Sequence, residues 1–248
     1  MIKKQLKKIE KMARNALHGT VGHFGYQITK NTPRYYLHDF ASYEEYRDIQ
    51  VEHNKRKIER VWADEETLSI IADRVNEEFD DLPKGSIFGL CHGARNGFEQ
   101  KVLQQKIKKS DRILGTDISE TATDFENSVH WDFHDENPDW LGKCHVIYTN
   151  SLDQSWKPSD AVRTWVDQLV EGGMLFIEHT KAHSASGASE MDPFGADPYM
   201  MPYLLSEWLG HKASIEIIKT TKTLARNNET QTMDLWLFVV KKTPQSSN

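Results

Sequence analysis

The residues best suited to chemistry lie in one stretch, where two apolar runs flank a glycine-bearing loop. The first run covers 86–91 and leads into a loop with Gly93 and Gly97, and the second covers 112–117 and ends on Asp117. Only glycine lets a backbone turn come this close to a ligand, and an acid that closes the next strand can accept hydrogen bonds from both ribose hydroxyls. The spacing therefore predicts a nucleotide cofactor site at the carboxyl ends of parallel strands.

The elements around this loop alternate between strand and helix patterns. Strands are predicted near 86–91, 112–117, 128–133, 144–150 and 173–179, and helices near 97–108 and 159–170. This alternation predicts an α/β fold with a doubly wound, mostly parallel sheet. After a helix around 199–209, two β-rich runs, 213–224 and 233–241, flank a polar turn. We expect them to form a terminal antiparallel hairpin, which completes a seven-stranded sheet.

Residues 1–82 are expected to form a helical N-terminal extension, and 83–248 the α/β domain. Apolar positions recur every three or four residues over 1–18, where six basic residues stand against one acid, which predicts an amphipathic basic helix. An aromatic segment follows, and then two helices, over 42–59 and 65–79. We expect the basic helix to pack on its own domain or on a second subunit, or else to contact an anionic membrane surface.

Charge and composition exclude several classes of function. The net charge of −6 argues against a generic nucleic-acid binder, and no apolar run approaches the roughly 18 residues that a membrane span needs. The two cysteines, Cys91 and Cys144, fall in or beside predicted strands without the spacing of a metal or disulfide framework. We therefore expect a cytoplasmic protein, with peripheral membrane contact through 1–18 as an open alternative. The sequence leaves the oligomeric state open.

The order of these elements resembles the class I S-adenosylmethionine-dependent methyltransferase family over residues 84–242. The first motif of that family is an acid followed by three alternating glycines at the end of the first strand. The matching positions here are Gly89, Cys91, Gly93 and Arg95, so the acid and two of the three glycines are missing. The match of this first motif is therefore partial.

The later motifs match the family better. Asp117 closes the second strand, where the family holds the ribose, and Asp132-Phe133 closes the third, where the family places an acid near the adenine amino group and an apolar side chain against the ring. The fourth strand ends on Asn150, and 169–178 is similar to the family's glycine turn into its fifth strand. Together these motifs imply a Rossmann-like methyltransferase domain with S-adenosylmethionine as its cofactor.

The resemblance implies a set of cofactor-binding residues. They are Gly89, His92, Gly93, Arg95, Asp117, Ile118, Asp132, Phe133 and Asn150. The backbone of Gly89, His92 and Gly93 would cradle the methionine half, and Arg95 with its neighbour Asn96 would contact the carboxylate of that half. The acidic contact to the amino group must come from elsewhere in the chain or be absent.

Methyl transfer from a sulfonium requires an acceptor lone pair held in line, and a base as well when the acceptor is a hydroxyl. Candidate bases follow the fourth and fifth strands, and they are His179, Asp153 and His183. A histidine titrates in the useful range, although a histidine at a strand end is more often structural. The set His179, His183, Asp192 and Asp197 could instead hold a divalent cation, but its spacing matches no metal motif.

We expect a methyltransferase that acts on a hydroxyl of a small molecule or a glycan. The segment 181–198 is expected to fold over the acceptor, with the aromatic segment 23–46 as the opposite wall. A nucleic-acid amino group is not the expected acceptor, because the fourth motif lacks the Pro-Pro-aromatic sequence that family members use for it.

Two alternatives to a methyltransferase stay open. One is an NAD-dependent oxidoreductase or epimerase, because Asp117 follows Gly97 at the expected spacing, although the G-x-G-x-x-G order is absent. The other is a non-catalytic scaffold that keeps the fold and docks through its basic N-terminal helix.

Overall fold

A computed structural model describes residues 34–226 and 229–244 of the chain. The basic helix predicted over 1–18 and the first part of the aromatic segment lie outside these described residues. Within the described ranges, no helix has the length and the apolar content needed to cross a membrane.

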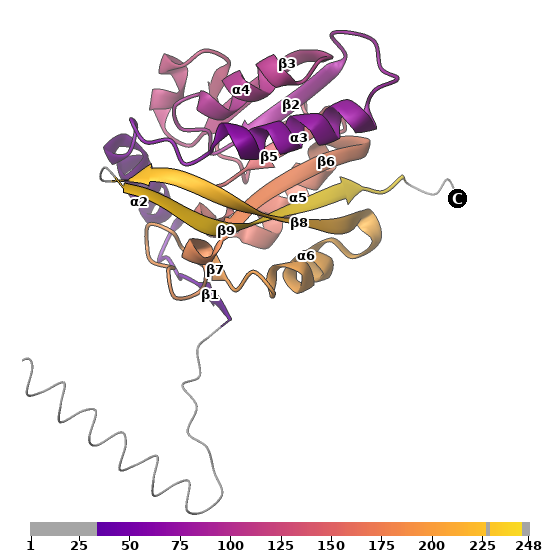
Figure 1. The fold of residues 1–248 in the computed structure, drawn as a ribbon. Coiled ribbons are helices and arrows are strands. Elements are labelled where there is room, and N and C mark those ends of the chain that lie inside the picture. Colours follow the sequence, from indigo (N-terminus) through magenta and orange to yellow (C-terminus); the bar gives the residue numbers. More distant parts are fainter. Residues whose placement is uncertain (1–33, 227–228, 245–248) are drawn as a thin grey trace, which may run out of the picture. The chain divides into compact units, whose positions relative to one another are not determined.

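A seven-stranded sheet runs through the middle of the described part (Figure 1). Its strands, in spatial order, are β4 (Ser128–His130), β3 (Ser110–Asp117), β2 (Ile87–His92), β5 (Cys144–Thr149), β6 (Leu169–Thr180), β9 (Glu229–Lys242) and β8 (Ala213–Arg226). The first five are parallel to one another, and β9 is antiparallel to both β6 and β8. The predicted α/β class, the mostly parallel sheet and the terminal antiparallel hairpin are confirmed.

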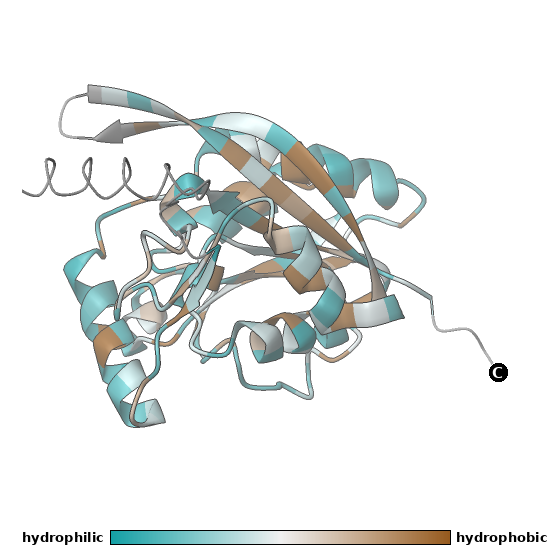
Figure 2. Ribbon diagram, turned by 90° about the horizontal axis from the view of Figure 1, so that it is seen from below, coloured by the Kyte–Doolittle hydropathy of each residue, from teal (hydrophilic) through white to brown (hydrophobic). Residues whose placement is uncertain are grey.

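Helices cover both faces of this sheet. On one face lie α3 (Glu65–Glu78) and α4 (Phe98–Lys106), and on the other α5 (Pro158–Gln168) and α6 (Met201–Leu209) (Figure 1). Because both faces are buried, neighbouring residues of one strand enter different cores: Val146 packs with the α3 and α4 side, and Ile147 with the α5 and α6 side. Figure 2 shows the result as hydrophobic central strands surrounded by helices whose outer faces are hydrophilic.

Helix α2 (Tyr43–Arg56) begins directly after its N-cap residue, Ser42, at the start that the sequence predicts. Ser42 accepts a hydrogen bond from the backbone N of Glu45, whose own carboxylate accepts one from Ala41 N at 2.7 Å. Its buried side chains are unusual for a helix that packs on a domain, because all of them carry polar atoms: Tyr46, Gln50, His53 and Asn54. Hydrogen bonds and ring contacts, rather than an aliphatic stripe, therefore hold α2 in place.

Short 3₁₀ helices follow three of the strands, and a fourth follows α6. They are η1 (Glu120–Asp124), η2 (Leu152–Gln154), η3 (Lys181–His183) and η4 (Gly210–Lys212). The first three begin where the chain leaves the carboxyl ends of β3, β5 and β6, so they fix the directions in which these loops depart.

The fifth parallel strand begins earlier than predicted. β6 starts at Leu169, which pairs with Cys144, whereas the next pair along the ladder joins Met174 to Val146. The glycine-containing stretch 170–173 therefore bulges outward inside the strand. Glycine permits this because the bulge needs a positive φ, which is 76° at Gly172.

The aromatic segment and the segment after β6 pair with each other. β1 (Tyr35–Leu37) forms a small antiparallel sheet with β7 (Phe194–Ala196), and the rings of Tyr35 and Phe194 lie 5.7 Å apart edge to face. At these positions the expectation of two opposite walls is wrong, because the two segments lie side by side. Strands of three residues leave no periodic pattern in the sequence, so this pairing could not be predicted from it.

The close packing of β2 against β5 predicts the effect of a mutation. A Cβ on Gly89 would lie 2.6 Å from Val146 Cγ1 and 2.8 Å from the Val146 carbonyl oxygen, so Gly89→Ala should lower the free energy of unfolding by about 1–3 kcal/mol. Urea denaturation measures this loss. The double variant with Val146→Ala should lose less stability than the sum of the two single losses, because the smaller side chain at position 146 relieves one of the clashes. An unchanged unfolding midpoint for Gly89→Ala would contradict this packing.

Candidate active site

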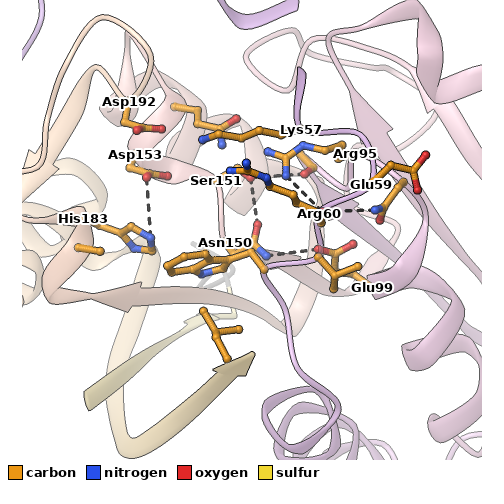
Figure 3. Close-up of a pocket in the computed structure, with 17 residues that line it drawn as sticks. Lys57, Glu59, Arg60, Arg95, Glu99, Asn150, Ser151, Asp153, His183 and Asp192 are labelled. Carbon is orange, nitrogen blue, oxygen red and sulfur yellow. Dashed lines mark hydrogen bonds and ion pairs between the residues drawn. The ribbon is translucent and has the colours of Figure 1, made fainter. Parts of the chain in front are cut away.

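A polar cavity of about 700 Å³ opens at the carboxyl ends of β2 and β5 (Figure 3). Its wall combines the glycine loop after β2, the loop after β5, the segment after β6 and the linker between α2 and α3. Its charged and hydrogen-bonding lining includes Lys57, Arg60, Arg95, Asn96, Glu99, Asn150, Ser151, Asp153, His183 and Asp192. A cavity with so many charged side chains favours a polar ligand over an apolar one.

A second, much smaller cavity adjoins the first. It measures about 20 Å³ and is lined by Tyr46, Gln50, Asn54, Gly93, Asp117, Ile118, Asp132, Phe133 and Gln154. Gly93 and Gln154 line both cavities, so the two meet at the glycine loop. The sequence-predicted residues Asp117, Ile118, Asp132 and Phe133 thus lie together on one side of Gly93, and Arg95, Asn150, Asp153 and His183 on the other.

The glycine loop is held against the loop after β5. Gly93 has a φ of 74°, and a Cβ there would come within 2.5 Å of Ser151 Oγ, so only glycine fits. Two other predicted loop residues lie below the cavities and do not line them: Gly89 sits in the middle of β2, and the buried ring of His92 bonds to Thr116 Oγ1 and Gln168 Oε1. The side chain of His92 is structural here, and its carbonyl oxygen accepts a hydrogen bond from Thr149 Oγ1 at 3.0 Å.

Asp117 ends β3 and is 7% exposed. Its Oδ1 accepts a hydrogen bond at 2.8 Å from the backbone N of Ser119, and Ser119 is the N-cap residue of η1. Burial raises the pKa of Asp117, although hydrogen bonds to its carboxylate oppose the shift. A buried acceptor at the strand end is suited to the paired hydroxyls of a ribose.

Asp132 lies in the loop after β4 and not at the strand end, because β4 stops at His130. Its Oδ2 accepts from Tyr43 Oη at 2.8 Å, and its Oδ1 lies 2.6 Å from Nδ1 of His134. Burial pushes the pKa of Asp132 upward, but hydrogen bonds from His134 and Tyr43 outweigh it, and the pKa is lowered overall. The carboxylate therefore stays ionised beside Phe133.

Helix α2 closes the small cavity, and sequence reasoning missed this role. Tyr46 Oη donates to the carbonyl of Gln154, and Gln50 Nε2 donates to the carbonyl of Met191 at 3.2 Å. Asn54 Oδ1 accepts from Thr121 in η1. The signal was present in the sequence, since three residues with polar side-chain atoms at i, i+4 and i+8 lie on one helix face.

Asp153 and His183 form a buried pair in the large cavity. His183 Nε2 lies 3.8 Å from Asp153 Oδ2, and the two side chains are 8% and 12% exposed respectively. The backbone N of Thr180 donates to His183 Nδ1, so the neutral ring carries its proton on Nε2, facing Asp153. Burial first, and then the charge of Asp192, raise the pKa of Asp153 well above its usual value, while burial lowers that of His183.

His179 does not line either cavity. It is 3% exposed, and its Nε2 donates to the carbonyl of Ala196 at 2.9 Å, which ties β7 to the sheet. Burial lowers the pKa of His179 to about 4. The structure therefore gives this side chain a structural role, and brings together Asp153 and His183 from the three predicted bases.

The four residues considered for a divalent cation do not form a cluster. Among the described residues, no group of three or more histidine, cysteine, aspartate or glutamate side chains could hold a metal ion. The pair Asp153 and His183 lacks a third ligand there.

Arg95, Asn96 and Asn150 line the large cavity as predicted. Asn96 is already engaged, because its Nδ2 donates to the carbonyl of Ile58 at 2.9 Å and so anchors the linker after α2. Arg95 Nε is buried without a partner among the described residues. Asn150 Nδ2 donates to Glu99 Oε1 at 3.3 Å, a contact that the sequence did not suggest.

The sequence matches no protein-family model and no curated protein. Solved structures resemble it nevertheless. The 1,6-didemethyltoxoflavin-N1-methyltransferase of Burkholderia thailandensis has a TM-score of 0.57 at 11% identity, over 83% of this chain and 92% of that one. The N-methyltransferase NodS of Bradyrhizobium japonicum WM9 has a TM-score of 0.53 at 15% identity, over 79% and 99%. The CMeT domain of citrinin polyketide synthase has a TM-score of 0.52 at 13% identity, over 83% and 59%.

These likenesses define the fold of the chain as that of the Rossmann-like class I S-adenosylmethionine-dependent methyltransferases. The toxoflavin and NodS structures contain bound S-adenosylhomocysteine. In this chain the antiparallel β9 lies between β6 and β8. The doubly wound dinucleotide-binding fold has instead two parallel βαβαβ halves in the order 3-2-1-4-5-6.

The buried histidines predict how stability depends on pH. Burial lowers the pKa of His92 and of His179 to about 4 from 6.5, so between these values the unfolded chain binds protons that the folded one does not. The free energy of unfolding should therefore fall as the pH drops from 6.5 toward 4, by up to about 1.4 kcal/mol per pH unit for each histidine. His179→Gln should flatten this dependence, whereas the same change at the exposed His211 should not. Urea denaturation at several pH values measures the slope, and equal slopes for all three proteins would contradict the assignment.

Proposed function

We propose that the protein is an S-adenosylmethionine-dependent methyltransferase that acts on a hydroxyl of a small polar molecule or of a sugar. The supporting observation is the pair of cavities that meet at Gly93. One holds the acids expected for ribose and adenine, and the other holds a buried carboxylate and imidazole. This separation into two cavities matches a cofactor whose adenosine end and reactive end lie on opposite sides of a glycine loop.

The residues of the small cavity fit the adenosine half. Asp117 would accept from the ribose hydroxyls, Ile118 and Phe133 would flank the adenine, and Asp132 would accept from its amino group. At about 20 Å³ the cavity has room for about one water molecule, so side chains of α2 such as Tyr46 must move to admit adenosine. Hydrogen bonds to Gln154 and Asp132 hold these side chains, and such bonds exchange with water at little net cost. The ring of Tyr46 also stacks on Trp156, with the centroids 5.5 Å apart, and this contact would have to shift.

The large cavity would hold the methionine half and the acceptor. When bound, S-adenosylmethionine supplies an electrophilic methyl group on its sulfonium. Asp153 would accept the proton of the acceptor hydroxyl, since its raised pKa makes it a stronger base than an exposed aspartate. His183, with Nε2–H facing Asp153, would orient that carboxylate.

A base in the cavity favours a hydroxyl acceptor over an amine. An amine nitrogen carries a reactive lone pair once neutral, whereas a hydroxyl gains nucleophilicity when its proton is withdrawn. The two N-methyltransferases among the similar structures keep an amine as the second candidate. The inserted antiparallel strand speaks against the NAD-dependent alternative.

Cofactor binding is the first test of this proposal. Isothermal titration should detect binding of S-adenosylhomocysteine and no binding of NAD. Asp117→Asn should weaken the binding of S-adenosylhomocysteine about tenfold or more, because a charged acceptor for the ribose is lost. Asp124→Asn, an exposed acid at the end of η1, is the matched control and should bind normally. Tight NAD binding without a response to S-adenosylhomocysteine would reject the proposal.

The proposed base gives a second prediction. Asp153→Asn should lower kcat for methyl transfer by about 10²–10⁴-fold with the affinity for S-adenosylhomocysteine unchanged, because it removes the proton acceptor. A panel of sugars and small hydroxylated metabolites, assayed by release of S-adenosylhomocysteine, supplies the substrate.

The neighbouring acid provides the check on this role. The charge of Asp192 raises the pKa of Asp153, so Asp192→Asn should lower that pKa and move the acid limb of the kcat profile to lower pH. An unmoved limb, or full activity of Asp153→Asn, would show that Asp153 is not the base.

A further inference from the structure

Glu99 is a buried carboxylate that the folded chain only half satisfies. Glu99 lies in the first turn of α4 and is 6% exposed. Its Oε1 accepts from Asn150 Nδ2 at 3.3 Å. Its Oε2 is buried and has no hydrogen-bond partner among the described residues. Figure 3 shows the carboxylate beside Asn150 in the wall of the large cavity.

A buried carboxylate oxygen without a partner is costly, so this side chain calls for an explanation. Burial raises the pKa of Glu99, and hydrogen bonds from its own backbone N–H and from Asn150, followed by the positive charge of Arg95, oppose that shift. No ion pair between Arg95 and Glu99 is present in the described part of the chain. Because Glu99 lines the large cavity, a cationic hydrogen-bond donor bound there would satisfy this oxygen.

The position of Glu99 relative to the glycine loop identifies that donor. A cofactor with its adenosine against Asp117 must pass Gly93 to enter the large cavity, because Gly93 lines both spaces. On the β2 side, Arg95 and Glu99 line the large cavity, and they provide one cation and one anion. The amino-acid tail of S-adenosylmethionine carries one ammonium and one carboxylate, which complement these charges.

We propose that Glu99, oriented by Asn150, binds the ammonium group of the amino-acid tail of S-adenosylmethionine. This inference rests on the proposed function and adds a residue to it. The acid absent from the first motif, where Gly89 stands, is then replaced from a different element, the first turn of α4. Arg95, whose Nε lacks a partner among the described residues, faces the carboxylate of the same tail.

Other acids of the cavity are less suited to this contact. Glu59 is exposed, so a salt link there is weakened by water. Asp153 pairs with His183 and is close enough to Asp192 for the charge of one to raise the pKa of the other. Asp153 Oδ1 is likewise buried without a partner among the described residues, but it belongs to the loop after β5 and not to the β2 side. Among the described acids that line this cavity, Glu99 has one bonded oxygen and one free oxygen on the β2 side.

The test compares two ligands on three proteins, the natural protein and two variants, by isothermal titration. The ligands are S-adenosylhomocysteine and its deaminated analogue, in which hydrogen replaces the amino group. Glu99→Gln keeps the shape and the acceptor for Asn150 but removes the charge. It should weaken S-adenosylhomocysteine about tenfold or more and leave the deaminated analogue within about twofold. Glu59→Gln removes the same charge from the exposed rim and should change neither affinity.

The six affinities separate the outcomes. Equal loss for both ligands in Glu99→Gln would mean that the variant distorts the cavity, and it would overturn the assignment. Unchanged affinity for S-adenosylhomocysteine would overturn it as well, while the proposed function stands. No binding of S-adenosylhomocysteine to the natural protein would reject the proposed function itself, and with it this inference.

Discussion

The site depends on one constraint of topology, the adjacency of β2 and β5. From β2 the sheet grows outward to β3 and β4 in one direction and to β5 and β6 in the other. The helices that follow these two strands, α4 and α5, therefore lie on opposite faces, and the loops that lead into them diverge. A crevice must open between these loops. Gly93 and Ser151 mark its base, where the two loops still touch.

This crevice is closed by contacts of an unusual kind. Helix α2 presents Tyr46, Gln50 and Asn54 to it, and these side chains bond to loops that follow three different strands. A helix with a leucine stripe in that place would seal the crevice by burying apolar area, and opening it would expose that area to water. Hydrogen bonds can be exchanged for bonds to water or to a ligand, so a polar face suits a cover that has to be displaced.

The sequence predicts the sheet better than the site. Strands such as 86–91 and 144–150 are continuous apolar runs, and burial on both faces produces that pattern directly, so they were found within a residue or two. Asp117 was found because a strand end fixes where its side chain points. Asp132 was placed at a strand end but lies in a loop, since hydrogen bonds to Tyr43 and His134 determine its position. The roles of α2 and of the β1–β7 pair depend on tertiary contacts that leave little local periodicity.

The packing at positions 89 and 99 explains why the acid of the first motif is absent at the first position and why a carboxylate still lies near the crevice at the second. A carboxylate at position 89 would have to be accommodated between Val146 and Ile113, where even a methyl group does not fit without movement. At position 99 the carboxylate lies in the wall of the large cavity, where an amide holds one oxygen and the other has no partner among the described residues. Its desolvation costs stability in the ligand-free protein, and a bound cation would recover part of that cost as affinity. A buried acid with one unpaired oxygen in the ligand-free protein and the proposed charge-specific binding of a ligand thus both follow from one placement.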